Sequence, residues 1–157
     1  MSNYNKSWTL SSLLRVRSRC FIMLSKLEQL EDEASKEKIN IYYKNISLDG
    51  FCIKDNICIN KAMCNTKKYW VLEHEYTHLK LGALYTLESK DIYIKKQERK
   101  VNDFIIKKHK LDQEVLAALK RGCDKDEICF GLNLPYEVFD ATIDYMYRKG
   151  ILHYEIY

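Results

Sequence analysis

The sequence is poor in the residues that dominate extended proteins, with one proline and five glycines in 157 residues. Collagen-like, elastic and linker-dominated proteins are therefore excluded. No apolar run approaches the ~20 residues of a membrane span, and the run near residue 21 is only Phe21–Leu24. Hydrophobic residues make up 46% and charged residues 31%, which indicates an ordinary globular domain with no membrane segment.

The six cysteines contain no Cys-x-x-Cys pair, which argues against a zinc ribbon or a thioredoxin-like site. The Met1–Lys6 start is not followed by a long apolar stretch, so we expect no signal peptide. These features predict a cytoplasmic protein with free thiols.

Net charge is +4, but residues 112–157 carry 5 Lys/Arg against 9 Asp/Glu. Electrostatic attraction to nucleic acid is therefore not expected from the C-terminal part.

Apolar spacing predicts a helix from Leu10 to about Ser35, followed by a short β-type run at 39–43. The segments 51–54 and 57–60 flank Asp55-Asn56, which indicates a hairpin with Lys54 opposite Ile57. A helix from Asn65 or Thr66 to Leu81 should end at Gly82. Further helices are expected at about 94–109 and in three shorter segments up to Gly150.

We therefore predict an α+β fold in which a small antiparallel sheet packs on the helix that ends at Leu81, in a zincin-like arrangement. Residues 1–110 would form the core, and residues 111–157 a helical tail packed on it within one compact domain.

The informative motif is His74-Glu75-Tyr76-Thr77-His78, a His-Glu-x-x-His pattern inside the predicted helix. Positions i and i+4 lie on one helical face, so both imidazoles can reach one Zn²⁺. Glu75 points away from the ion but can reach the attacking water, and so can act as general base. The alternative is a helix with two buried structural histidines and a surface glutamate.

Catalytic zinc needs a third protein ligand. Glu88, Asp91 and Glu98 are candidates, and we favour Glu98 because it falls near the apolar face of the next predicted helix. Glu88 and Asp91 lie in the presumed loop, which holds a ligand less rigidly. A carboxylate that interacts only with its helix dipole is the alternative for Glu98. A peptidase also needs an oxyanion stabiliser, for which Tyr85 and Tyr93 in the same loop are candidates.

With these motifs, the chain resembles the ImmA/IrrE family of small metallopeptidases over roughly Leu24–Ile151. The resemblance implies that His74, His78 and Glu98 bind zinc, that Glu75 is the base, and that the activity is endopeptidase cleavage of a specific protein. That target would be a helix-turn-helix transcriptional repressor of a phage or mobile element, in the host bacterial cytosol. Tyr76-Thr77 and Val101 depart from the family pattern, which usually has Leu/Ile-Gly and Ala there.

The tail has a helix-turn-helix-like pattern over residues 115–149, but its second helix opens with Glu137, Asp140 and Asp144. Carboxylates at that position would repel phosphates, so we expect a supporting or substrate-docking role and no direct DNA binding. An alternative function for the whole chain is a non-catalytic, zinc-containing interaction module that sequesters a regulator.

Overall fold

The structure is a computed structural model that describes residues 10–86 and 88–153, with side chains from residue 23 onward. It is a mixed α+β structure in which six helices accompany one three-stranded sheet. The helices are α1 Leu10–Lys36, α2 Asn65–Leu81, α3 Asp91–His109, α4 Leu111–Lys120, α5 Lys125–Leu132 and α6 Tyr136–Arg148. The strands are β1 Asn40–Lys44, β2 Gly50–Ile53 and β3 Asn56–Asn60.

The sheet is mixed, and the prediction of an antiparallel sheet is wrong. Its order is β1-β3-β2, with β1 parallel and β2 antiparallel to β3. The chain leaves β1, crosses to the opposite edge as β2, and turns back through the hairpin into the centre. Ile57, Cys58 and Ile59 of β3 are all buried, and a continuous apolar run of this kind is typical of a central strand.

The hairpin register also differs from the predicted one. Cys52, not Lys54, lies opposite Ile57, so the turn consists of Lys54 and Asp55. Lys54 adopts a positive φ of 52°, and Asn56 is the first residue of β3. Asn40 of β1 explains the shift, because its backbone N–H donates to Asp55 O and its side chain pairs with that of Asn56.

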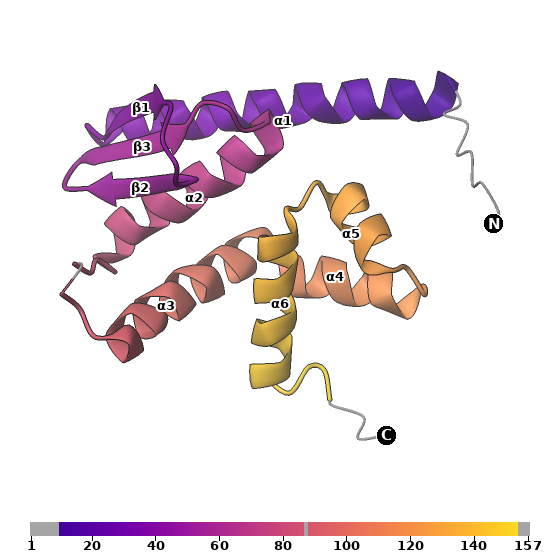
Figure 1. The fold of residues 1–157 in the computed structure, drawn as a ribbon. Coiled ribbons are helices and arrows are strands. Elements are labelled where there is room, and N and C mark those ends of the chain that lie inside the picture. Colours follow the sequence, from indigo (N-terminus) through magenta and orange to yellow (C-terminus); the bar gives the residue numbers. More distant parts are fainter. Residues whose placement is uncertain (1–9, 87, 154–157) are drawn as a thin grey trace.

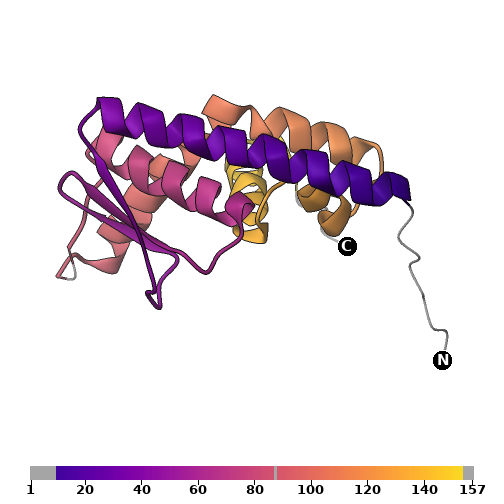
Figure 2. The ribbon, with the colours of Figure 1, turned by 90° about the horizontal axis from the view of Figure 1, so that it is seen from above.

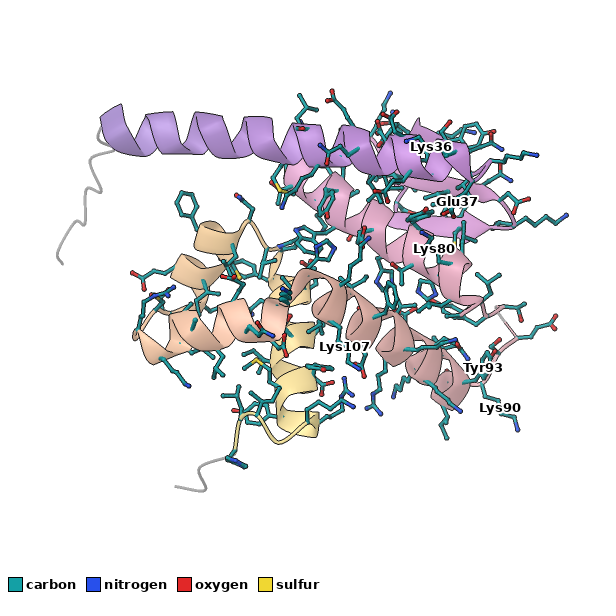
Figure 3. All side chains as sticks on the ribbon, turned by 180° about the vertical axis from the view of Figure 1, so that it is seen from behind. Lys36, Glu37, Lys80, Lys90, Tyr93 and Lys107 are labelled. Atoms are coloured by element: carbon teal, nitrogen blue, oxygen red, sulfur yellow. The ribbon has the colours of Figure 1, made fainter. Side chains whose placement is uncertain are left out.

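Helix α2 lies against the sheet and is flanked by α1 and α3 (Figures 1 and 2). The inward face of the sheet carries Ile57 and Ile59, which join Leu72 and Tyr76 of α2 in one buried apolar cluster. Figure 3 shows Glu37 and Lys80 side by side between α1 and α2, where their charged groups approach to 3.1 Å. Most of the packing energy comes from the apolar cluster, because exposed ion pairs contribute little.

The helical tail packs against the other end of α3, where α6 crosses its C-terminal half (Figure 1). Val115, Ile128 and Met146, from three different tail helices, belong to the same buried cluster as the α2 residues. The indole Nε1 of Trp70 on α2 donates to Asn133 O at 2.8 Å, in the turn before α6. The helix-turn-helix character of α5 and α6 stays a prediction. Among the described residues, no helix has both the length and the apolar composition needed to cross a bilayer.

Candidate metal centre

Helix α2 carries the two histidines of the motif on one face, one turn apart. The helix ends at Gly82, which takes the left-handed conformation (φ 57°) and donates its N–H to Leu79 O. The nitrogen atoms Nε2 of His74 and His78 face each other at 3.1 Å. His78 is buried, and His74 is partly exposed at the mouth of the site.

Glu98, in the second turn of α3, completes the cluster. Its Oε2 lies 3.1 Å from His74 Nε2, and its Oε1 lies 3.1 Å from His78 Nε2. Among the described residues, these three form the group whose donor atoms are close enough to share one metal ion. The cluster, which we call the His74–His78–Glu98 site, brings together the three residues that the sequence predicted as ligands, and their role as ligands stays a prediction. Glu88 and Asp91, the alternatives for the third ligand, are exposed and stay outside it.

The orientation of His78 is fixed by the chain reversal after α2. Its Nδ1 lies 2.7 Å from the carbonyl oxygen of Ala83, the residue after Gly82. A carbonyl only accepts, so Nδ1 carries a hydrogen; Nε2 then presents its lone pair to the site when His78 is neutral, and donates to Glu98 when His78 is protonated. Metal-binding histidines are typically oriented by such an outer hydrogen bond.

Tyr85 contacts the carboxylate from the loop between the two helices. Its hydroxyl donates to Glu98 Oε1 at 2.7 Å. Its ring packs edge-on against the His78 ring, with 5.8 Å between the two ring centroids. Burial alone would raise the pKa of Glu98, but hydrogen bonds from His74, His78 and Tyr85 hold that pKa well below its usual range. Glu98 is therefore an anion at neutral pH.

The pKa of His78 is raised. Burial opposes the shift, but the hydrogen bonds to Glu98 and to the Ala83 carbonyl outweigh it. The negative charge of Glu98 and the nearby imidazoles therefore favour a positive charge in the space between these three side chains. A proton or a metal ion can supply that charge.

The donor set fits a tetrahedral metal ion. Bonds of about 2.0–2.1 Å at tetrahedral angles place neighbouring ligand atoms about 3.3 Å apart. In the cluster the two nitrogen atoms lie 3.1 Å apart, and each lies 3.1 Å from a different oxygen of Glu98, which is Oε2 for His74 and Oε1 for His78. Two neutral imidazoles and one carboxylate are also a ligand set that zinc accepts at catalytic sites.

Glu75 lies on the wall of a cavity that opens beside the site, together with His74 and Glu98. Strand β2 approaches it closely: a Cβ added to Gly50 would lie 3.6 Å from Glu75 Cγ. Burial first, and then the charge of Glu75, raise the pKa of Cys52 to about 12, so it stays protonated. The carboxylate thus faces the space next to the predicted metal ligands.

The cavity has a volume of about 330 Å³. It extends from the His74–His78–Glu98 site between α2 and α3 to the tail helix α6. The apolar side chains of the lining away from the site include Val71, Ile105, Val138 and Ala141. The sequence did not predict Val138 and Ala141 as lining residues, because no local pattern shows that α6 packs next to α2 and α3.

The two tyrosines predicted as oxyanion stabilisers have different surroundings. Tyr85 belongs to the site, but its hydroxyl proton is donated to Glu98. Tyr93, in the first turn of α3, donates to Leu84 O at 3.4 Å and lies near Lys90 at the outer end of the helix (Figure 3). The geometry therefore supports a positioning role for Tyr85, which the sequence pattern did not indicate.

A second polar cluster lies one residue away along α2. Glu73 is buried, and its Oε1 accepts from Lys108 Nζ at 2.7 Å and contacts His109 Nε2 at 3.1 Å. These hydrogen bonds lower the pKa of Glu73 although burial alone would raise it. We call this group the Glu73–Lys108–His109 clamp, since it joins α2 to the C-terminal end of α3.

No protein-family model, curated protein or solved structure matches the chain.

Proposed function

We propose that the chain is a zinc-dependent endopeptidase that cleaves a specific protein target. The observation that carries the proposal is the convergence of two imidazole nitrogens and one carboxylate at mutual distances of 3.1 Å, with Glu75 beside them on the wall of a cavity. Zinc, when bound by His74, His78 and Glu98, would supply Lewis acidity that polarises a carbonyl and activates water.

The residues of this chain would then perform the proton transfers. Glu75 carries a carboxylate that can take a proton from the attacking water and return it to the amine nitrogen of the departing peptide segment. Tyr85 keeps Glu98 in place through its hydrogen bond to Oε1, and the Ala83 carbonyl keeps His78 in the ligand orientation. Such outer contacts typically change metal affinity or activity by about 10–100-fold.

The proposed substrate is a helix-turn-helix transcriptional repressor, by the family resemblance of the His74–Glu75–His78 and Glu98 motifs. The reaction would take place in the cytoplasm. The exposed carboxylates of Glu137, Asp140 and Asp144 on α6 would repel DNA phosphates. We therefore propose that the chain meets the repressor protein itself and does not bind DNA directly.

Three carboxylate-to-amide variants test the proposal. Metal content is measured after zinc loading, and cleavage of a repressor encoded next to this gene is followed by mass spectrometry. The wild-type protein and Glu75→Gln should each hold about one zinc ion, but cleavage should be slower in Glu75→Gln by about 10²–10⁴-fold. Glu98→Gln should lose zinc, while Glu88→Gln, a matched control on the preceding loop, should match the wild type.

Failure of the wild type to cleave the repressor would contradict the protease function. If Glu75→Gln also kept full biological activity, the non-catalytic interaction module would replace it. Retention of zinc by Glu98→Gln would instead contradict the ligand set.

A further inference from the structure

We propose that the cavity beside the His74–His78–Glu98 site binds one large apolar side chain of the protein substrate, such as that of leucine, methionine or phenylalanine. The inference deepens the proposed peptidase function and rests on it. It concerns the substrate preference of the site and names α6 as the element that sets this preference.

The position of the cavity is the first support. His74, Glu75 and Glu98 form one end of its lining, so a side chain inside it would place the adjoining peptide group at the proposed reaction centre. The cavity is also continuous with the space that Glu75 faces. A side chain held there would orient the peptide bond, which is a main source of rate enhancement in enzymes.

The chemistry of the walls is the second support. Val71 of α2, Ile105 and Ile106 of α3, and Val138 and Ala141 of α6 supply the apolar lining. Ile105 and Ile106 are buried, and Val138 and Ala141 are half-buried, which is the pattern of a wall between core and solvent. Removing an apolar substrate side chain from water against such a wall is favourable in proportion to the area buried.

The size of the cavity limits its occupant. At about 330 Å³ it lies at the small end of the range for ligand pockets, about 300–1,000 Å³. It holds one large side chain with part of its backbone. A helix laid on the surface or a whole folded segment does not fit.

The charges at the far rim favour a neutral occupant. Lys67 lies there, and its Nζ contacts Asp49 at 2.9 Å and Glu137 at 3.6 Å. Among the described lining residues, this is the lysine or arginine that could attract an acidic side chain, and two carboxylates already neutralise it. The same ion pairs occupy Asp49 and Glu137, the two carboxylates at this rim.

The experiment uses small hydroxamates, which bind catalytic zinc without being cleaved. Acetohydroxamate serves as the baseline, and hydroxamates of blocked leucine, phenylalanine, alanine, arginine and aspartate differ only in side chain. Their affinities for the zinc-loaded protein are measured by calorimetry. The leucine or phenylalanine compound should bind at least about tenfold more tightly than the alanine compound.

Two matched variants locate the preference. Ala141→Phe places a ring in the cavity and should reduce the preference for leucine over alanine to about twofold or less, with unchanged zinc content and acetohydroxamate affinity. Ala117→Phe makes the same change on an exposed position of α4 and should keep the full preference. Circular dichroism and thermal unfolding of both variants show whether they fold. Val138→Ala is a milder change in the same α6 wall, and it enlarges the cavity.

The outcomes separate this inference from the proposed function. Equal affinity for all the hydroxamates, or a preference for the arginine or aspartate compound, would overturn the proposed apolar preference. Acetohydroxamate binding in the same experiment would show that the zinc site is still present. Val138→Ala widens the cavity and should shift the preference from leucine toward the larger phenylalanine compound; an unchanged preference in both Ala141→Phe and Val138→Ala would overturn the role of α6. A wild-type protein that bound neither zinc nor acetohydroxamate would contradict the proposed function itself.

Discussion

Two polar clusters lie between α2 and α3, and they use adjacent residues of α2 in opposite ways. In the Glu73–Lys108–His109 clamp, one buried carboxylate meets a lysine and a histidine from the end of α3. In the His74–His78–Glu98 site, two imidazoles and a carboxylate converge, and no lysine or arginine among the described residues forms a hydrogen bond or ion pair with these three side chains. The first cluster is neutralised within the chain, and the second requires a positive charge from outside.

This difference in internal neutralisation distinguishes the two clusters more clearly than burial does. Glu73 is more deeply buried than Glu98, and both have a lowered pKa. A buried ion pair holds helices together but attracts no further ion. A set of lone pairs that all point to one place is stabilised by a metal ion, and it is otherwise repulsive unless protonated.

The largest expected effect is on zinc affinity, when one side chain of each cluster is replaced in turn. His78→Ala should reduce zinc affinity by more than the 10–100-fold typical of a lost outer contact, because a direct ligand disappears. Glu73→Gln should keep about one zinc per chain. Competitive titration with a chelator measures both affinities, and zinc loss in Glu73→Gln would show that the clusters are not separate.

A bulkier residue at Gly50 should disturb the packing of β2 on α2 close to the His74–His78–Glu98 site, because an added Cβ would also lie 3.6 Å from Glu75 Cγ. An added Cβ would lie 2.5 Å from Val71 Cγ1 and 3.2 Å from Cys58 O. Gly50→Ala should therefore destabilise the protein by about 1–3 kcal/mol through overpacking. The double variant Gly50→Ala/Val71→Ala removes the closest contact and should recover part of that loss in urea unfolding, whereas strict additivity would contradict the steric explanation.

Breaking the clamp should cost stability without affecting the metal. Lys108→Met leaves the buried Glu73 carboxylate with His109 as its remaining partner, and should lower the free energy of unfolding by about 1–2 kcal/mol. Lys107→Met is the control, since Lys107 is the exposed neighbour on α3 (Figure 3). That control should change stability by less than about 0.5 kcal/mol.

The smallest effect is a difference in pH dependence. Because the pKa of Glu73 is lower in the folded protein than that of an ordinary glutamate, its stabilising contribution is present above the ordinary glutamate pKa. The contribution is lost as the pH falls through the lowered pKa of the folded state. Glu73→Gln should therefore show a shallower loss of unfolding free energy than the wild type between pH 6 and pH 3, and parallel curves would contradict the assignment.

The sequence predicted the parts of the structure that depend on local periodicity. His74 and His78 are four residues apart, so their shared face follows from helix geometry alone. The apolar pattern near Glu98 predicted Val101, Phe104 and Ile105 on the inward face of its helix; Val101 and Ile105 are buried, but the prediction for Phe104 is wrong, since its side chain is exposed. The end of α2 at Gly82 was predicted from the preference of glycine for the left-handed conformation.

The sequence did not predict the features that depend on distant pairing. The Asp55-Asn56 turn signal was wrong because β1 recruits Asn56 into the sheet, and nothing within the hairpin shows this. The parallel pairing of β1 with β3 was missed for the same reason. The role of Ala83 was also inaccessible, since any residue carries the carbonyl that orients His78.

The hydrogen bond from Trp70 to Asn133 has a practical consequence for spectroscopy. Trp70 lines the cavity, contacts the His109 ring at 5.2 Å, and joins α2 to the turn that precedes α6. The chain has one other tryptophan, Trp8, which lies outside the described residues. A Trp8→Phe protein would thus contain a single indole fluorophore, whose emission reports at the same time on cavity filling and on the docking of the tail.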